Sequence, residues 1–332
     1  MKKLTARKRY LFIRILEACN AGCFMCGYRQ SRDSYRITIG EFKIILSQAH
    51  AMGVEVVRFT GGEPLLHNDV TRLISLGAAD NMKMSLITNG YLLPKLIGQL
   101  SEVGLAQVIV SIDGASADTH DSYRNVPGIF GKCMVGIESA LNKGVLTRVN
   151  TVVGPHNYTE MPRLQKRLSK LGVQQWELSA IKLEQRVTYP DRDHVLSVCE
   201  PIYEANNGSM LVPMGKRFYG DTLLEQDLYF KFGISPRPSP PQCHLVGDAL
   251  YLDAKAGLGF GCSLLPHRNA EESGGGVRMR TKDGWTLDVT EFHDHVNQFR
   301  LEGYKRCRSC STTAAGYSDQ VALTGNVDLW QF

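Results

Sequence analysis

Between residues 10 and 181 the chain alternates short β-branched or apolar runs with longer segments of helical periodicity. Strands are expected at residues 10–16, 54–59, 84–87, 107–112, 147–152 and 176–181. Helices are expected between them at residues 39–52, 69–81, 94–103, 130–143 and 159–171. Strands that alternate with helices pair in parallel through right-handed crossovers. The sequence therefore predicts an α/β fold, a partial (β/α)6 barrel of the TIM type rather than a complete eight-stranded one.

Unusual loops follow four of the expected strands at their carboxyl ends. Cys19 follows the first strand, Gly61 and Gly62 the second, Asn89 the third and Asp113 the fourth. In barrels of this type the loops at the carboxyl ends of the strands carry the chemistry, while the strands hold those loops in place. We therefore expect a functional site on this rim of the barrel.

The alternation stops after residue 182, where a second part of the chain is expected to begin. A proline-rich stretch at 235–241 is typical of a stiff connector. Apolar runs at 249–252 and 257–262 flank a turn and predict a hairpin. We expect three parts: a partial barrel at 1–182, a connector and substrate-capping region at 183–242, and a small α+β domain at 243–332.

The composition is that of an ordinary folded chain. Of 332 residues, 43% are hydrophobic and 21% are charged, with a formal net charge of +5, which excludes disordered and collagen-like chains. No apolar run approaches the ~18 residues of a membrane span, and the first residues lack the apolar core of a secretory signal. We expect a cytoplasmic protein that binds neither membranes nor nucleic acid, because charges of both signs are mixed along the chain.

The nine cysteines indicate metal binding or catalysis rather than disulfides, because cytoplasmic thiols stay reduced. Seven of them fall into two groups, and the first group, Cys19, Cys23 and Cys26, has the spacing C-x3-C-x2-C. Three thiolates on one loop can hold three irons of a cubane and leave the fourth iron open to a small molecule. The alternative, a structural zinc site, normally has four protein ligands, and no fourth Cys or His lies near in the sequence.

The spacing of the first group resembles the radical SAM superfamily, and a second motif strengthens the resemblance. Gly61, Gly62 and Glu63, followed by proline, match the GGEP motif that this superfamily carries after its second strand. The resemblance implies a 4Fe-4S cluster whose open iron chelates S-adenosylmethionine. The two glycines permit close backbone approach, and Glu63 is expected to accept a hydrogen bond from the methionine ammonium group.

The same resemblance assigns contacts to other residues of the rim. Ser111, Asp113 and Arg124 are expected to contact the ribose and the methionine carboxylate, and Asn89 and Asn150 occupy rim positions that suit polar contacts. Each of these residues, taken singly, is equally explained as a turn or strand cap. One position departs from the pattern, since methionine stands directly before the third cysteine, where the superfamily usually has an aromatic residue.

The second cysteine group comprises Cys243, Cys262, Cys307 and Cys310. Four thiolates close either a zinc site or a fully ligated 4Fe-4S cluster, and the spacing does not choose between them. The order of a hairpin, a helix expected at 289–301 and a Cys-x2-Cys pair resembles the twitch domain, a shortened form of the SPASM domain. The resemblance implies a second, auxiliary 4Fe-4S cluster, which takes an electron from a substrate radical or shapes the pocket.

The resemblance also implies a reaction, in which S-adenosylmethionine is cleaved reductively and the 5'-deoxyadenosyl radical abstracts a hydrogen atom. The auxiliary spacing is similar to that of 2-deoxy-scyllo-inosamine dehydrogenases, and the size and tail are similar to those of cytosylglucuronate decarboxylases. We therefore expect a small carbohydrate or nucleoside substrate that is decarboxylated or dehydrogenated in antibiotic or other natural-product biosynthesis. A flavodoxin or ferredoxin is the expected electron donor. Two alternatives stay open, a peptide-modifying maturase and a zinc-stabilised scaffold without enzymatic activity.

Overall fold

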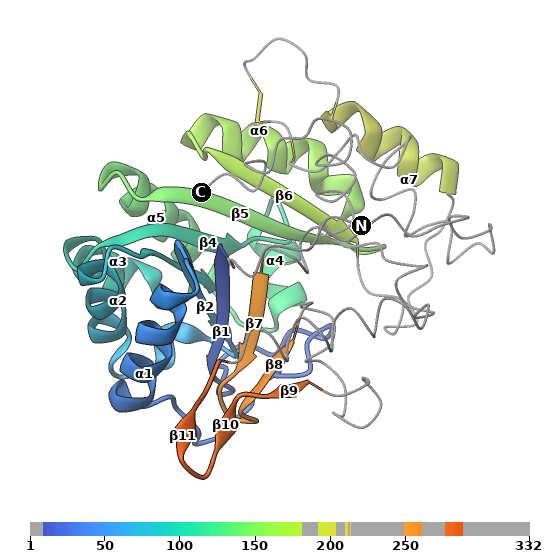
Figure 1. Ribbon diagram of the computed structural model, residues 1–332. Helices are drawn as coiled ribbons and strands as arrows, with labels where there is room; N and C mark the ends of the chain where they lie inside the picture. The colour runs from blue at the N-terminus through green and yellow to red at the C-terminus, as the bar shows by residue number, and fades with distance from the viewer. Residues whose placement is uncertain are drawn as a thin grey trace, which may run out of the picture.

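The computed structural model describes residues 9–180, 192–203, 249–260 and 276–287, together with residues 210, 211 and 213. Six strands pair in parallel in the order of the sequence and form one strongly twisted sheet (Figure 1). These strands are β1 (Tyr10–Leu16), β2 (Val56–Gly61), β3 (Lys83–Thr88), β4 (Leu105–Ser111), β5 (Leu146–Val153) and β6 (Gln175–Ala180). The predicted α/β partial barrel is confirmed.

Helices connect these strands and cover the outer face of the sheet (Figure 1). The crossover helices are α1 (Ile39–Ala51), α2 (Val70–Ala79), α3 (Leu93–Glu102), α5 (Ile129–Asn142) and α6 (Met161–Leu171), with α7 (Arg192–Cys199) after β6. Short 3-10 turns lie at η1 (Pro64–Leu66), η2 (Tyr158–Glu160) and η4 (Glu200–Tyr203). None of the helices in the described ranges has both the length and the apolar character that crossing a membrane requires.

One described helix of the barrel was not expected from the sequence, α4 (Ala117–Arg124) between β4 and α5. Its buried face is made by His120, Tyr123 and Arg124. Because two of these three side chains are polar or charged, the segment lacks the apolar stripe by which a surface helix is recognised. The helix ends at Asn125, which has the left-handed backbone conformation common at this position.

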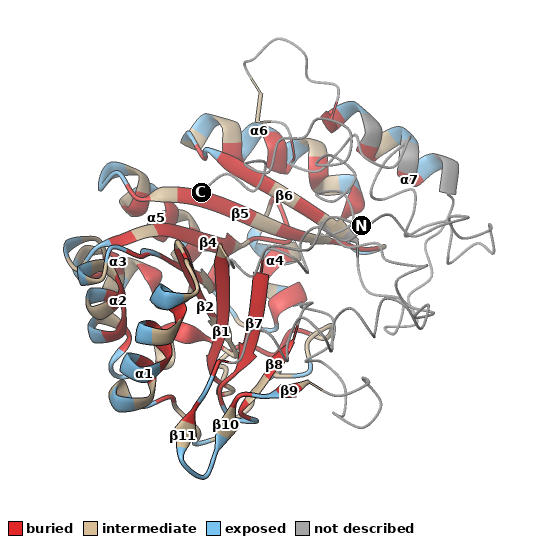
Figure 2. Ribbon diagram, in the orientation of Figure 1, coloured by how far each residue is buried: buried red, intermediate tan, exposed pale blue. Residues whose placement is uncertain are grey.

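Two different layers fill the space on the two faces of the sheet. Leu11, Ile13 and Phe59 of the strands belong to the same buried apolar cluster as residues of the helices, and the Phe59 ring packs on the Phe42 ring of α1 with centroids 5.4 Å apart. Figure 2 shows the barrel strands buried over most of their length. The helices supply matching faces; in α1, for example, Phe42 and Ile45 are fully buried. Burial of the outer face under helices accounts for the apolar residues that recur along the strands.

The inside of the barrel is polar near the amino ends of the strands. Arg58 on β2 and Arg148 on β5 are each only 1% exposed. Arg58 donates to Ser85 Oγ (3.1 Å) and to Gln107 Oε1 (2.8 Å), and Arg148 donates to Gln175 Oε1 (3.0 Å). All five residues are the first or third of their strands, so this hydrogen-bonded network fills the end of the barrel opposite the expected site.

The predicted hairpin is present and continues the barrel sheet. It consists of β7 (Ala249–Asp253) and β8 (Leu258–Phe260), followed by β9 (Val277–Arg278), β10 (Arg280–Thr281) and β11 (Gly284–Trp285). Strand β7 pairs in parallel with β1 (Figure 1), and the buried ion pair between Arg14 Nη1 and Asp253 Oδ2 (2.5 Å) joins the two strands. The boundaries 1–182, 183–242 and 243–332 stay predictions, and the helix expected at 289–301 lies outside the described residues.

Candidate functional site

The first cysteine group lies on a loop that leaves the carboxyl end of β1. The loop folds back on itself through hydrogen bonds from Cys19 N to Ser31 O (2.9 Å) and from Gln30 N to Ala21 O (2.8 Å). Within it, Cys26 N donates to Cys23 O (3.1 Å), which brings the second and third cysteines into one turn. The cysteine loop therefore lies on the rim of the barrel where the sequence predicted it.

Each of the three sulfur atoms has an N–H donor within hydrogen-bonding distance. Ala21 N donates to Cys19 Sγ (3.4 Å), Tyr28 N donates to Cys26 Sγ (3.4 Å), and Arg124 Nη1 donates to Cys23 Sγ (3.6 Å). Donors aimed at sulfur stabilise the thiolate form and are one of the features by which proteins tune iron–sulfur clusters. The loop is therefore arranged to hold thiolates. Without a cation nearby, however, buried thiols are hard to ionise.

Burial opposes ionisation of two of these thiols. Desolvation raises the pKa of Cys19 to about 11. Desolvation also raises the pKa of Cys23, and the neighbouring Arg124 guanidinium opposes that rise. A metal centre deprotonates the thiols that coordinate it and reverses this situation. Buried thiols with N–H donors aimed at their sulfur atoms therefore fit a cationic iron centre better than they fit free cysteines.

The Gly61–Gly62 pair lies against the base of the cysteine loop. Gly62 N donates to Leu16 O (3.1 Å), and Glu63 N donates to Ala18 O (2.8 Å). A Cβ atom on Gly62 would lie 2.1 Å from Ala18 O, which is a backbone atom that cannot move aside. Glycine is therefore required here by close approach of two backbone segments, as the motif predicted.

The Glu63 carboxylate is fully buried and binds the loop after β3. It accepts hydrogen bonds from Thr88 Oγ1 (2.7 Å), Asn89 N (2.7 Å) and Leu65 N (3.0 Å). Burial raises the pKa of Glu63, and these three donors act in the opposite direction. An ionised carboxylate has about four acceptor positions, so three are used and one is left for a ligand donor.

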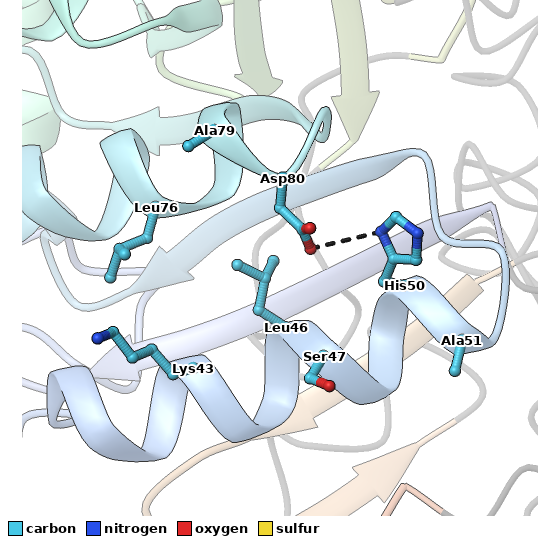
Figure 3. A pocket seen from close by; sticks show the side chains of 8 residues that line it. All are labelled: Lys43, Leu46, Ser47, His50, Ala51, Leu76, Ala79 and Asp80. Carbon is cyan, nitrogen blue, oxygen red and sulfur yellow. Dashed lines mark ion pairs between the residues drawn. The ribbon is translucent and has the colours of Figure 1, made fainter.

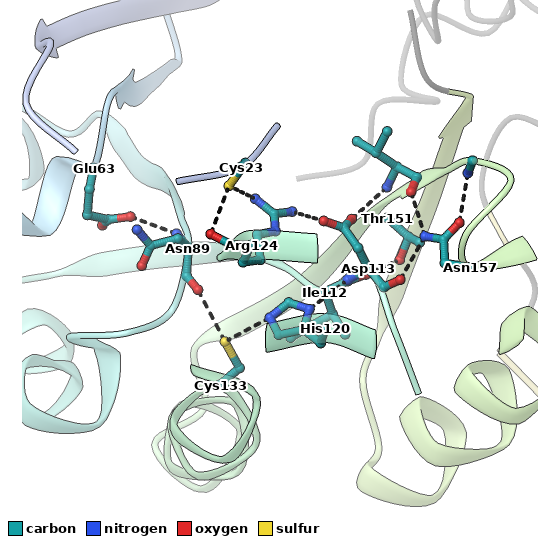
Figure 4. Close-up of polar contacts among 12 residues, drawn as sticks. Cys23, Glu63, Asn89, Ile112, Asp113, His120, Arg124, Cys133, Thr151 and Asn157 are labelled. Carbon is teal, nitrogen blue, oxygen red and sulfur yellow. Dashed lines mark hydrogen bonds and ion pairs between the residues drawn. The ribbon is translucent and has the colours of Figure 1, made fainter. Parts of the chain in front are cut away.

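Asp113 and Arg124 form an ion pair that reaches the cysteine loop (Figure 4). Arg124 Nη2 lies 2.5 Å from Asp113 Oδ2, the Asp113 side chain is fully buried, and Arg124 is 8% exposed. The carbonyl oxygen of Arg124 also accepts a hydrogen bond from Gly22 N (3.0 Å). The carboxyl end of α4 is thus attached to the cysteine loop through both its backbone and its side chain.

Asp113 itself is fixed by contacts on every side (Figure 4). Its Oδ1 accepts from Val152 N (2.8 Å), its carbonyl oxygen accepts from Asn157 Nδ2 (2.7 Å), and its amide donates to His120 Nδ1 (3.0 Å). With the amide donating to Nδ1, the neutral imidazole of His120 carries its proton on Nε2. These contacts join β4, β5 and α4 at one point of the rim.

The remaining predicted rim residues lie beside this centre. Ser111, the last residue of β4, is the register partner of Asn150 within β5. Asn89 Nδ2 donates to Asn20 Oδ1 inside the cysteine loop (2.7 Å). Directly before the third cysteine stands the half-buried Met25. One position earlier, the ring of Phe24 packs edge-on against the ring of Tyr123.

Three buried polar atoms of α4 and β5 lack a hydrogen-bond partner among the described residues: Tyr123 Oη and Arg124 Nε on α4, which contacts the loop, and Asn150 Oδ1 on β5. A buried polar atom without a partner costs about 1–3 kcal/mol, so such atoms mark the place of a missing group. Within the described ranges no three His, Cys, Asp or Glu side chains converge on a single metal position. A cubane does not need that arrangement, because each thiolate binds a different iron. The residues therefore fit a three-cysteine cluster with a polar ligand beside it.

The structure brings most of the predicted site residues together and adds three that sequence reasoning missed. Arg124 contacts Cys23 Sγ directly, and Asp113 is linked to the cysteine through Arg124. Gly62 and Glu63 bond to the backbone just before Cys19, and Asn89 bonds to Asn20 just after it. The additions are His120, Cys133 and Asn157, which hold Asp113 or Asn89; Cys133 was expected only to fill space. The second group, Cys243, Cys262, Cys307 and Cys310, lies outside the described residues.

A surface groove of about 520 Å³ lies elsewhere, between α1 and α2 (Figure 3). Across it His50 Nδ1 faces Asp80 Oδ2 at 3.4 Å, and both side chains are exposed. His50 is near the end of α1 and Asp80 follows α2. Since these helices return the chain to the start of the next parallel strand, their ends lie at the amino ends of the strands. The groove is therefore at the opposite end of the barrel from the cysteine loop.

The geometry defines a partial parallel β/α barrel with a three-thiol loop on its carboxyl rim. Residues 13–168 match the family model of the Radical SAM superfamily, and this match together with the fold supports assignment of the barrel to that superfamily. Solved structures agree in fold: SuiB of Streptococcus suis bound to S-adenosylmethionine superposes with a TM-score of 0.66 at 14% identity, covering 98% of this chain and 78% of SuiB.

Curated relatives match about half of the chain. The AdoMet-dependent heme synthase of Methanosarcina barkeri is 30% identical over 175 residues, which are 52% of this chain and 50% of that protein. The probable GTP 3',8-cyclase of Saccharolobus solfataricus is 30% identical over 176 residues, 51% of this chain and 55% of the relative. The chain thus spans about half the length of the curated relatives it matches.

Proposed function

We propose that the chain binds a 4Fe-4S cluster through Cys19, Cys23 and Cys26, binds S-adenosylmethionine beside it, and abstracts a hydrogen atom from a small carbohydrate or nucleoside. The observation that carries the proposal is the rim loop whose three sulfur atoms each receive an N–H donor, next to buried polar atoms that lack partners. When bound, the reduced cluster supplies the electron that cleaves S-adenosylmethionine to methionine and a 5'-deoxyadenosyl radical.

The chain's own residues then bind and orient the two ligands. The one free acceptor position of Glu63 accepts from the methionine ammonium group, and the unpartnered Nε–H of Arg124 donates to the methionine carboxylate. Asn150 Oδ1, also unpartnered, accepts from a hydroxyl at the rim, where Ser111 is its neighbour. A fixed set of such donors and acceptors places the reacting atoms without reorganisation during the reaction.

The proposal of a small substrate rests on the cysteine spacing and is supported by the names of the relatives. A heme synthase and a probable GTP cyclase are, by their names, enzymes of small molecules. The likeness to SuiB, at 14% identity, concerns the fold alone. Decarboxylation or dehydrogenation in natural-product biosynthesis, an auxiliary 4Fe-4S cluster on the second cysteine group, and a flavodoxin or ferredoxin donor belong to the same proposal.

Metal analysis of anaerobically reconstituted protein tests the cluster. We expect about four irons and four sulfides per chain for one cluster and about eight of each for two. Alanine in place of Cys19, Cys23 or Cys26 should remove about four irons, whereas Cys199→Ala, which removes a buried thiol of α7, should remove none. Stoichiometric zinc without iron would contradict the proposal and favour the scaffold alternative.

Product analysis tests the substrate class. The reduced protein is incubated with S-adenosylmethionine and panels of sugars, nucleosides and peptides, and 5'-deoxyadenosine is quantified. Formation that depends on a sugar or nucleoside, with deuterium transferred from labelled substrate, would support the proposal. Formation that depends on a peptide alone would instead identify a maturase.

A further inference from the structure

We propose that Arg124, held by Asp113, donates a hydrogen bond to the thiolate of Cys23 and thereby raises the reduction potential of the cluster before S-adenosylmethionine binds. This inference rests on the proposed function, since it requires a cluster on the cysteine loop. It gives Arg124 a role toward the cluster in addition to the ligand contact that its Nε–H offers.

The contact is buried and is made from a fixed position. Arg124 Nη1 lies 3.6 Å from Cys23 Sγ, with Cys23 6% and Arg124 8% exposed. The carbonyl oxygen of the same arginine accepts from Gly22 N (3.0 Å), directly before the cysteine. Two contacts thus join adjacent residues of the loop to one residue of α4. Together they fix the distance between the guanidinium and the sulfur.

Asp113 determines which way the guanidinium points. The planar guanidinium carries donors on separate nitrogens, so one ion pair fixes the direction of the others. Here Nη2 binds Asp113 Oδ2 while Nη1 meets the sulfur. Asp113 cannot follow a moving arginine, because Val152, Asn157 and His120 hold its carboxylate and both backbone groups. Asp113 therefore acts as a positioning residue.

The three sulfur atoms do not have equivalent donors. Cys19 and Cys26 receive neutral backbone N–H groups, whereas the donor to Cys23 carries a full positive charge. Hydrogen bonds from charged groups are roughly twice as strong as neutral ones, and charges interact strongly in a buried site. Reduction adds an electron to the cluster, so a cation at one thiolate stabilises the reduced form and raises the potential.

The decisive measurement is made without S-adenosylmethionine, because an arginine that contacts only the ligand has no effect on the cluster in its absence. The potential of the reconstituted cluster is titrated and followed by EPR for the wild type, Arg124→Gln and Arg124→Lys. The matched control is Arg163→Gln, an exposed arginine on α6 that also pairs with a carboxylate, Glu160. We expect a shift to more negative potential in Arg124→Gln, a smaller shift in Arg124→Lys, and none in the control.

A second measurement uses only the wild-type sequence and so does not depend on folding of the variants. Protein labelled with 15N-arginine is reduced without S-adenosylmethionine, and pulsed EPR should detect a coupled arginine nitrogen at the cluster. Absence of that coupling, or an Arg124→Gln cluster with the wild-type potential, would overturn the inference. If the cluster still assembles and cleaves S-adenosylmethionine in that case, the proposed function stands; if no cluster assembles in the wild type, the proposed function itself fails.

Discussion

The thiol of Cys133 on α5 donates a hydrogen bond to the carbonyl oxygen of Asn89 across 3.2 Å (Figure 4). The amide of the same Asn89 donates to Glu63 Oε2 (2.7 Å). Burial raises the pKa of Cys133 to about 12, so the thiol stays protonated and can donate. Asn89, in the loop after β3, is thus held from both sides, by Cys133 of α5 and by the buried carboxylate of Glu63.

Cys133→Ala should destabilise the protein more than the loss of a buried thiol alone. The substitution leaves the Asn89 carbonyl without its donor, and an unsatisfied buried group costs about 1–3 kcal/mol. Cys199→Ala is the matched control, since Cys199 is 1% exposed and the structure gives no hydrogen bond to its sulfur within the described residues. Anaerobic urea denaturation gives both free energies of unfolding, and equal losses would contradict the role of the Cys133 bond.

Gly90→Ala should destabilise the protein in a way that depends on Cys133. Gly90 has φ +82°, and a Cβ atom there would lie 2.5 Å from Cys133 Sγ. A left-handed alanine costs about 1–2 kcal/mol, and steric overlap adds about 1–3 kcal/mol. In the Cys133→Ala background the overlap with the sulfur disappears and the 3.1 Å approach to Val110 Cγ1 is left, so Gly90→Ala should cost less there. If the losses in free energy of unfolding are strictly additive in this double-mutant cycle, the two side chains do not overlap.

Gly62→Ala should abolish cluster assembly rather than merely lower stability. Its Cβ atom would overlap Ala18 O, and Ala18 directly precedes the first cysteine of the loop. Gly131→Ala on α5 is the control, because no atom lies within 4 Å of a Cβ at that position, and alanine there favours the helix by about 1 kcal/mol. Iron per chain after reconstitution is the readout. Full iron content in Gly62→Ala would refute the close approach.

His120 should make the folded state less stable as the pH falls below neutrality. Burial lowers the pKa of His120 from 6.5 to about 3, with Arg124 acting in the same direction. Between these pH values the unfolded chain binds the extra proton, so stability decreases by up to about 1.4 kcal/mol per pH unit as the pH falls. His120→Asn keeps an acceptor for the Asp113 amide but does not titrate. The difference in urea midpoint between wild type and variant should therefore change from pH 7 to pH 5, and a constant difference would contradict the prediction.

Asp253→Asn should weaken the attachment of β7 to the barrel. It leaves Arg14, whose side chain is 8% exposed, without its carboxylate, and breaking a buried pair costs about 3–5 kcal/mol. Lys255→Met offers a contrast, because Lys255 pairs with Glu17 and Asp33 but is 43% exposed, and such pairs contribute about 0–1 kcal/mol. Denaturation of both variants should separate these costs. Similar losses would show that burial does not set the strength of these ion pairs.

The barrel was predictable because its strands bury one apolar face under helices. The six strands were expected within about two residues of their observed bounds. The cysteine loop was found by its C-x3-C-x2-C spacing, and Gly61–Gly62–Glu63 by their resemblance to a family motif after the second strand. Helix α4 was missed because the residues it buries, such as His120 and Arg124, are polar. The bond between Cys133 and Asn89 was also beyond reach, since two residues 44 positions apart meet only through packing of α5 on the barrel.

The docking of β7 illustrates another limit of sequence reasoning. Alternating apolar residues and a turn predict a hairpin, and β7 and β8 form one. The same pattern contains no information about which sheet edge the hairpin joins. Parallel pairing with β1 depends on cross-strand contacts such as Phe12 stacked on Tyr251, with ring centroids 4.3 Å apart, and these contacts are visible only in three dimensions.

The position of β1 between β2 and β7 has a consequence for biosynthesis. The strand that leads into the cysteine loop leaves the ribosome early, yet its second neighbour begins only at Ala249. At about 5–20 residues per second, roughly 12–50 s of translation separate the two. During that interval one edge of β1 has no partner strand, so a nascent chain must keep that edge covered until the hairpin arrives.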